Sequence, residues 1–183
     1  MEAAEALGRG NLSTFYEALR EAARSRSRAF WIVAGLTVAA AALRFATLGA
    51  QAYHHDEIVT ASRVLRADFW HAMEAVGFSE SAPPLYYALA WFWTQIAGTG
   101  EVGLRSFSAL AGVATVPVAY LLGAELRSRR TGIVAAALVA VNPMLLWYSQ
   151  EARSYALLAL LTALAALYFV RALRTGDVPS LRG

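Results

Sequence analysis

The chain contains no cysteine, and only 16% of its 183 residues are charged. Without cysteine it can form neither disulfides nor thiolate metal sites. A soluble domain of ordinary composition carries about a quarter charged residues, so the low share of charge argues against a soluble protein. The 58% of hydrophobic residues instead indicates an integral membrane protein, for which we expect an all-α fold.

An early apolar segment of the kind found in cleavable signal peptides is also missing from residues 1–28, which are rich in charge. We therefore expect 1–28 to be a cytoplasmic N-terminal tail, with a polar helix over 13–28, leading into an uncleaved membrane helix. The arginines are gathered in clusters instead of along a stripe. This pattern favours topology signals over a nucleic-acid surface.

Long apolar segments that suit membrane-spanning helices recur along the chain. A spanning helix needs about 20 mostly apolar residues. The predicted spans lie at about residues 29–49, 104–125, 131–149 and 154–172. Arg44 interrupts the first of them, where we expect its side chain to snorkel outward or to bind a lipid phosphate.

A fifth segment, 81–100, is uncharged but differs in kind. Its apolar stretch is only about 13 residues long, a length more typical of interfacial than of spanning helices. It opens with Pro-Pro, ends in Gly-Thr-Gly and is rich in tyrosine and tryptophan, which favour the membrane–water boundary. We predict a helix on the outer surface, with a five-span topology as the alternative.

Three arginine clusters, at 24–28, 127–130 and 171–174, decide between the two topologies. Loops on the cytoplasmic side carry an excess of basic residues. Four spans place all three clusters in the cytoplasm, together with a C-terminal tail over 175–183, whereas five spans would place the middle cluster outside. With four spans, the loop 50–103 and the turn 149–154 lie on the same outer face.

The outer loop 50–103 is too long for a plain connector. One helical face of residues 56–76 carries Ile58, Ala61, Leu65, Phe69, Met73 and Val76. We therefore expect one amphipathic helix over 56–76 that lies on the membrane. With the aromatic helix after it, the loop holds two juxtamembrane helices.

The stretch "YHHDE" at 53–57 stands just past the first span. Asp56 and Glu57 begin the amphipathic helix, where acidic residues also favour the helix dipole without any further role. Adjacent helical residues point in different directions, so one can face a site while the other braces the fold. His54 and His55 are candidates to ligate a metal or to bind a phosphate. They lack the i, i+4 spacing of helical zinc ligands, so the sequence indicates no metal site, and we predict no cofactor.

The turn "YSQEARSY" at 148–155 joins two spans with almost no loop and holds Glu151 and Arg153 at the membrane surface. Such a turn can be polar simply because it is wet, but ionisable groups near the membrane are functional candidates. Arg105, at the start of the second span, can snorkel or bind a phosphate. Pro117 and Pro143 are expected to bend helices.

The order of these motifs resembles the N-terminal part of the GT-C membrane glycosyltransferases. The acidic pair is followed by "APPLYYALAWFW", "EVGLRSFSALAGVATVPVAYLLG", the basic turn "RSRRTG" and "NPMLLWYSQEARSYAL". The likeness is greatest to bacterial members of the family 39 type, related to protein O-mannosyltransferases and lipid A aminoarabinose transferases. It covers roughly residues 30–175.

The resemblance implies a multi-pass protein of the cytoplasmic membrane whose active face is outside. It implies a polyprenyl-phosphate sugar as donor, membrane lipids as surroundings, and a glycan, lipid or protein as acceptor. The implied catalytic residues are Asp56, as general base, and Glu57, as its alternative. The candidate substrate-binding residues are Tyr148, Gln150, Glu151, Arg153, His55 and Arg105, with Arg153 as phosphate partner and Glu151 orienting the acceptor or the sugar.

Members of this family are typically several hundred residues long, so the chain resembles their first module only. A fragment or one half of a split transferase is the expectation under this interpretation. The competing interpretation is a non-catalytic membrane scaffold or a transporter module. A carrier would be expected to place carboxylates near the bilayer midplane, whereas the carboxylates here stand at the ends of the spans.

Overall fold

The computed structural model describes residues 27–50, 52–66, 68–79 and 84–175, and all regular structure in these ranges is helical. The helices, in chain order, are an N-terminal helix Ser27–Phe45, α2 His55–Val64, α3 Phe69–Ser79, α4 Leu85–Ala97, α5 Glu101–Leu126, α6 Arg129–Val141, α7 Pro143–Ser149 and α8 Tyr155–Thr175. The predicted all-α fold is confirmed. The predicted polar helix 13–28 and the tail 175–183 lie almost entirely outside the described residues.

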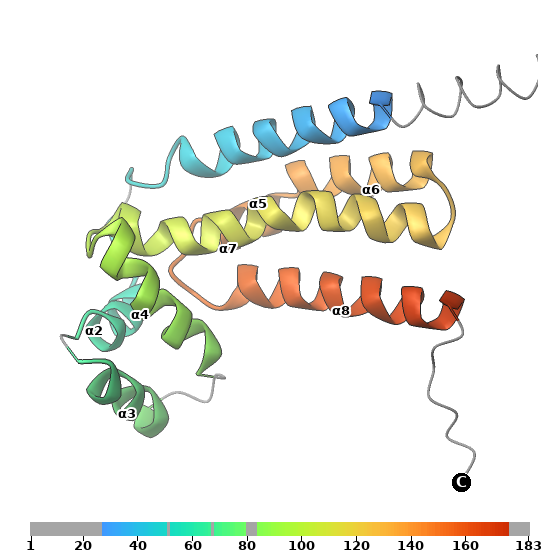
Figure 1. Ribbon diagram of the computed structural model, residues 1–183. Helices are drawn as coiled ribbons and strands as arrows, with labels where there is room; N and C mark the ends of the chain where they lie inside the picture. The colour runs from blue at the N-terminus through green and yellow to red at the C-terminus, as the bar shows by residue number, and fades with distance from the viewer. Residues whose placement is uncertain (1–26, 51, 67, 80–83, 176–183) are drawn as a thin grey trace, which may run out of the picture.

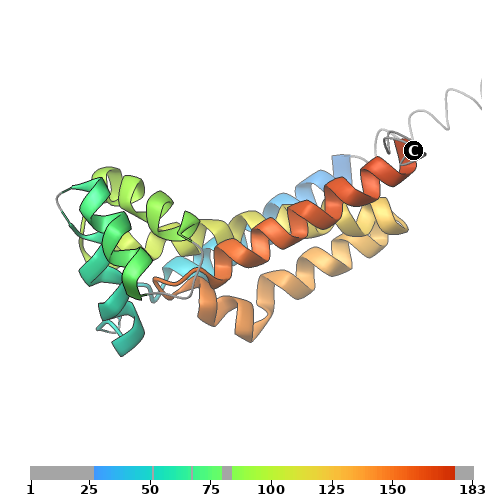
Figure 2. The same ribbon diagram turned by 90° about the horizontal axis from the view of Figure 1, so that it is seen from below.

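The long helices run lengthwise beside one another, and the short helices α2, α3 and α4 gather at one end of them (Figures 1 and 2). The α5 helix is central, because it packs against α4, α6, α7 and α8. The chain therefore divides into a bundle of apolar helices and a cap of three helices. The turn between α7 and α8 reaches the same end as this cap (Figure 1).

Within the described part of the chain, three helices are long and apolar enough to cross a membrane: Ser27–Phe45, α5 and the stretch Tyr155–Arg174 of α8. The pair α6 and α7 qualifies as a fourth when it is counted as one span bent by 58°. With 13 residues, α4 is not among these candidates. This count of three or four candidate spans is consistent with the predicted four spans.

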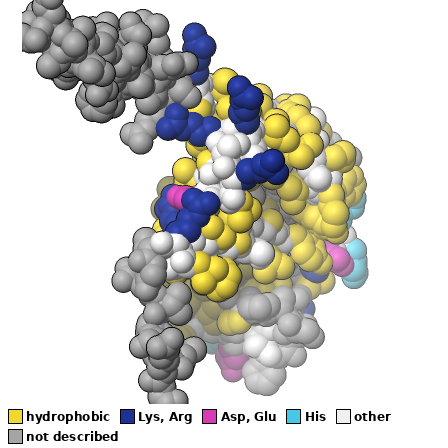
Figure 3. Space-filling view, turned by 90° about the vertical axis from the view of Figure 1, so that its right-hand side faces the viewer, with side chains coloured by type: hydrophobic (Ala, Val, Ile, Leu, Met, Phe, Trp, Pro, Cys, Tyr) yellow, Lys and Arg dark blue, Asp and Glu magenta, His cyan; other side chains and the backbone are white. Residues whose placement is uncertain are grey.

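Arginines gather at the end of the bundle opposite the cap, where α5 turns into α6 and α8 ends (Figure 3). Arg127 and Arg130 are exposed there, while Arg171 and Arg174 both pair with Glu125 of α5, at 3.0 and 3.4 Å. Two of the three predicted clusters thus share one end. The third begins outside the described residues, which include only its Arg28.

The predicted single helix over 56–76 is wrong, because this segment forms two helices, α2 and α3, with a break after Val64. Two contacts explain the break. The indole Nε1 of Trp91 donates to the carbonyl oxygen of Arg66 at 3.0 Å, and the Asp68 carboxylate accepts from the backbone N–H of His71 at 3.0 Å. The carbonyl groups at the end of a helix and the N–H groups at its start have no partner within the helix. The two contacts supply such partners, so they favour an end of α2 before Arg66 and a start of α3 after Asp68.

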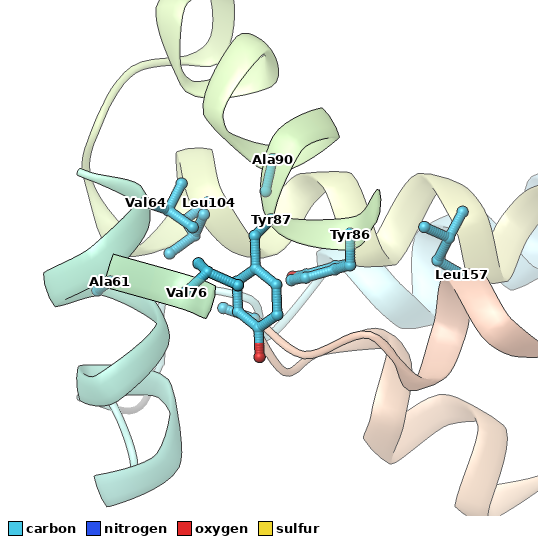
Figure 4. Packing of buried hydrophobic residues seen from close by; sticks show 9 residues of the cluster. Ala61, Val64, Val76, Tyr86, Tyr87, Ala90, Leu104 and Leu157 are labelled. Atoms are coloured by element: carbon cyan, nitrogen blue, oxygen red, sulfur yellow. The ribbon is translucent and has the colours of Figure 1, made fainter. Parts of the chain in front are cut away.

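The cap is held by a cluster of buried apolar side chains from all of its helices (Figure 4). Tyr86 and Tyr87 of α4 occupy its centre, each only 2% exposed, and their rings pack edge to face at 5.6 Å. The cluster also contains Ala61, Val64, Val76, Ala90, Leu104, Ala152 and Leu157. The Tyr86 hydroxyl is 3.0 Å from the Ser108 hydroxyl of α5, so both an apolar core and a buried hydrogen bond join the cap to the bundle.

The bundle itself packs through small residues. Its buried cluster consists of Ala40, Val116, Ala136 and Ala140, and a Cβ atom at Gly132 of α6 would overlap the carbonyl oxygen of Tyr120 on α5. Small side chains let membrane helices approach closely, and this approach supplies their packing energy. Pro143 stands at the bend between α6 and α7 as predicted, whereas α5 continues through Pro117 as one helix.

Candidate active site

Glu57 lies where the start of α2, the start of α5 and the α7–α8 turn meet. Its side chain is 1% exposed, and its two carboxylate oxygens accept four hydrogen bonds. Arg105 Nε and Nη2 donate to it at 2.8 and 2.6 Å. The backbone N–H groups of Ala152 and His54 donate at 2.8 and 3.0 Å. One buried carboxylate thus holds together three segments that are far apart in the sequence.

Arg105 is buried as well, with its side chain 4% exposed. It donates to the carbonyl oxygens of Leu48 and Ala52 at 3.0 and 3.2 Å, and its guanidinium lies over the Tyr53 ring at 5.2 Å. The expectation that Arg105 snorkels outward is therefore wrong. Its planar fork instead pairs with Glu57 in the bidentate geometry that makes such ion pairs strong.

The environment of Glu57 determines its protonation. Burial disfavours the charged carboxylate, but the hydrogen bonds from Arg105 and from the backbone of Ala152 and His54 outweigh burial and lower the pKa of Glu57. Glu57 is therefore an ionised partner of Arg105 at neutral pH, with its oxygens already occupied.

Asp56, the neighbour of Glu57, has the opposite environment. Its side chain is 70% exposed, and its carboxylate lies 3.8 Å from Arg153 Nη2. Arg153 is also held by Tyr155, whose hydroxyl accepts at 3.5 Å and whose ring lies 5.6 Å below the guanidinium. An accessible carboxylate beside a fixed guanidinium is a combination that can take up a proton on one side and stabilise an anion on the other.

The α7–α8 turn is fixed on several sides. Besides the bond from Ala152 to Glu57, the carbonyl oxygen of Arg153 accepts from Ser108 Oγ at 3.2 Å. The amide of Gln150 donates to the carbonyl oxygens of Leu43 and Arg44 at 3.3 and 3.1 Å and to Thr47 Oγ1 at 2.8 Å. Gln150 is a predicted substrate ligand, but its side-chain amide nitrogen already donates hydrogen bonds to the end of the N-terminal helix.

Arg44 does not snorkel, which corrects a second expectation. It is fully buried and donates to Ser149 Oγ and to the carbonyl oxygens of Val139, Ala140 and Ala40, all at 3.2 Å. Among the described residues no carboxylate pairs with it. Two of its four partners are carbonyls in the last turn of α6, whose helix dipole favours a cation.

The other predicted site residues lie around this centre. His55 is exposed at the start of α2, and Glu151 is partly exposed in the turn. The ring of Tyr148 packs against that of Tyr155 at 4.6 Å. Among the described residues there is no group of three or more histidine, aspartate or glutamate side chains that could hold a metal ion.

A cavity of about 240 Å³ lies beside the Glu57–Arg105 pair, between the end of the N-terminal helix and the α7–α8 turn. Its lining includes His54 and Trp147, whose rings lie 6.1 Å apart at an angle of 35°. His54 belongs to the "YHHDE" motif and Trp147 directly precedes the "YSQEARSY" turn, yet neither is among the predicted substrate-binding residues. No local pattern pairs them, because only the tertiary fold brings them together.

A family model described as dolichyl-phosphate-mannose-protein mannosyltransferase matches residues 81–181. The match includes α4 to α8 and the turn that carries Arg153, but not Asp56. No curated protein and no solved structure matches the chain.

Proposed function

This chain belongs to the dolichyl-phosphate-mannose-protein mannosyltransferase family, and from that premise we propose that it transfers a sugar from a polyprenyl-phosphate donor to an acceptor on the outer face of the cytoplasmic membrane. The observation that carries the proposal is the exposed Asp56 carboxylate, held 3.8 Å from Arg153 at the end of the bundle opposite the arginine clusters. The acceptor is a hydroxyl group of a glycan, a lipid or a protein.

In the proposed reaction the acceptor oxygen attacks the anomeric carbon of the donor sugar. The bond between that carbon and the phosphate oxygen breaks, and the polyprenyl phosphate leaves with the bonding electron pair. Asp56 takes the proton of the acceptor hydroxyl, and Arg153 stabilises the charge of the leaving phosphate. A single displacement with no covalent intermediate inverts the configuration at the anomeric carbon.

The environments of the two acidic residues support Asp56 over Glu57 as the base. A general base needs a free lone pair within reach of its substrate. The Glu57 oxygens accept four hydrogen bonds in a buried ion pair, whereas Asp56 is exposed. Glu57 and Arg105 then act as positioning residues, because they fix the start of α2 against the turn that carries Arg153.

The remaining predicted residues take supporting roles in this proposal. Glu151 orients the acceptor or the sugar, and His55 and Tyr148 line the approach. Exposed apolar side chains of α4, such as Leu85 and Phe92, face the lipid that surrounds the donor tail. The arginines at the opposite end favour a cytoplasmic location for that end and an outer location for the site.

The direct test is sugar transfer by Asp56→Asn in the full protein. Loss of the base is expected to reduce transfer by about 100-fold or more, while membrane insertion stays unchanged. Asp68→Asn is the matched control, because Asp68 is an exposed acidic residue of the same cap whose hydrogen bonds, among the described residues, are to its own helix start. Unchanged transfer by Asp56→Asn would remove Asp56 as the base.

A further inference from the structure

We propose that the cavity beside Trp147 is a binding subsite for a neutral sugar ring. This inference rests on the proposed function and deepens it, because it names a substrate class for a part of the site that the two catalytic candidates do not touch. The cavity, called the Trp147 cavity below, has a volume of about 240 Å³ and is lined by Thr47, His54, Arg105, Trp147, Gln150 and Glu151.

The Trp147 cavity is lined by the two segments that also carry the proposed reaction centre. His54 precedes Asp56 by two residues on one wall, and Glu151 precedes Arg153 by two residues on the other. The buried Glu57 connects these walls, since it accepts from the backbone N–H groups of both His54 and Ala152. A ligand held in the cavity therefore contacts the same two segments that carry Asp56 and Arg153.

The lining of the Trp147 cavity suits a polyhydroxylated ring. The indole of Trp147 is 53% exposed and supplies an aromatic surface on which the C–H face of a sugar can pack. The Glu151 carboxylate accepts hydrogen bonds from hydroxyl groups, and such bonds to a charged acceptor are stronger than neutral ones. Aromatic walls with a few polar groups that fix orientation are typical of small-ligand sites.

Other occupants fit the Trp147 cavity less well. The guanidinium of Arg105, its permanent cation, is committed to Glu57 and to two backbone carbonyls. The Glu151 carboxylate repels a phosphate, and no set of three acidic or histidine ligands for a metal ion exists among the described residues. A neutral hydroxylated ligand avoids both the repulsion and the need for a free cation.

Trp147 also differs from the other exposed tryptophan of the bundle. Trp31 is 69% exposed on the N-terminal helix, where its ring contacts that of Phe30, and it lines none of this cavity. Trp31 therefore provides a matched control for the removal of an exposed indole. The two variants Trp147→Leu and Trp31→Leu make the same chemical change at two places.

Binding of methyl α-mannoside to the full chain in lipid nanodiscs tests the inference, with saturation-transfer NMR as the readout. We expect the wild type and Trp31→Leu to bind the sugar equally, and Trp147→Leu to bind it at least about fivefold more weakly. Glu151→Gln preserves the size of the side chain and is expected to weaken binding as well. Equal binding by the wild type and both cavity variants, or no binding by the wild type, would overturn the inference.

Two further probes identify the source of the sugar ring. If the ring belongs to the donor, Trp147→Leu weakens binding of polyprenyl-phosphate mannose and leaves binding of polyprenyl phosphate unchanged. If the ring belongs to an acceptor, Trp147→Leu leaves both lipid ligands unaffected and weakens only methyl α-mannoside. Either result supports a sugar subsite and assigns its occupant.

Failure of this inference is distinguishable from failure of the proposed function. Transfer that depends on Asp56, together with sugar binding that ignores Trp147 and Glu151, would remove the subsite and keep the transferase. Sugar binding that depends on Trp147, together with normal transfer by Asp56→Asn, would keep the subsite and remove the proposed mechanism.

Discussion

The two adjacent carboxylates at the start of α2, Asp56 and Glu57, have opposite environments. Successive residues of a helix are rotated by about 100° around its axis. One consequence is that Glu57, 1% exposed, points into the junction of α2, α5 and the α7–α8 turn. Asp56, 70% exposed, points to solvent beside Arg153. The two residue types are chemically similar, but one has its oxygens occupied and the other has them free.

Substitution of Glu57 is expected to affect stability more than any change at Asp56. Glu57→Gln leaves the Arg105 charge buried without its partner, and breaking a buried pair in this way costs about 3–5 kcal/mol. Asp56→Asn, at an exposed position, is expected to change stability by about 0.5 kcal/mol or less. Unfolding of both variants in detergent, followed by circular dichroism, measures the difference.

Similar unfolding of the two variants would show that the Glu57–Arg105 pair does not hold the cap onto the bundle. The comparison is sharp because the two substitutions convert a carboxylate into an amide at neighbouring positions of one helix.

The lowered pKa of Glu57 predicts a dependence of stability on pH. A carboxyl group whose pKa is lower in the folded than in the unfolded chain binds its proton more readily when unfolded. Its stabilisation is complete above the ordinary carboxyl pKa of 4.5 and is lost as the pH falls through the folded value. The stability difference between wild type and Glu57→Gln should therefore shrink on acidification below about pH 4.5. A difference that stays constant from pH 7 to pH 3 would contradict this account.

At the scale of elements, the break between α6 and α7 has a clear chemical cause. Pro143 lacks an N–H group, so the carbonyl oxygen of Val139 loses the partner that an unbroken helix would give it. Arg44 takes this place, because its Nη2 donates to Val139 O while Nη1 donates to Ala140 O. An intramembrane carbonyl without a hydrogen-bond donor is costly. Arg44 therefore stabilises the bend between α6 and α7, which positions the turn that carries Arg153.

Removal of this cation is expected to destabilise the bent pair α6–α7. Arg44→Met removes the Arg44 donors from the two α6 carbonyls, those of Val139 and Ala140, at about 1–3 kcal/mol for each group left unsatisfied. Pro143→Ala restores an N–H donor for Val139 O, so Arg44→Met should cost less in the Pro143→Ala background. A double-mutant cycle on unfolding free energies measures this coupling. Strictly additive effects would show that Arg44 does not compensate for the proline.

The elements also show where periodicity stops being informative. Apolar residues recur at helical spacing from Ile58 to Val76, and this pattern cannot distinguish one helix from two with a matching face. Two contacts decide where the helices end, one local and one tertiary. Asp68 accepts from a backbone N–H at the start of α3, and Trp91 of α4 donates to the Arg66 carbonyl. Only the first contact could be predicted from the nearby sequence, because Asp is a residue type that favours the position just before a helix.

At the scale of the whole molecule, charge distribution and apolar length were enough to predict the main arrangement. The arginine clusters required an even number of spans, and the structure brings "HHDE" and "SQEARS" to the same end of the bundle, with Arg153 3.8 Å from Asp56. The specific partners could not be predicted. Arg105 was expected to snorkel or bind a phosphate, and Gln150 to bind substrate. The groups they contact in the structure, Glu57 and the end of the N-terminal helix, are brought to them only by tertiary packing.

The central claim is that the two polar motifs form one site on the outer side of the membrane, opposite the arginines. Because the chain contains no cysteine, single cysteines at Asp56, Glu151 and Arg130 can report the side on which each residue stands. A membrane-impermeant thiol reagent applied to intact cells is expected to label Asp56→Cys and Glu151→Cys, and to label Arg130→Cys only after permeabilisation. Labelling of Asp56→Cys and Glu151→Cys from opposite sides, or of all three from the same side, would contradict the shared outer site.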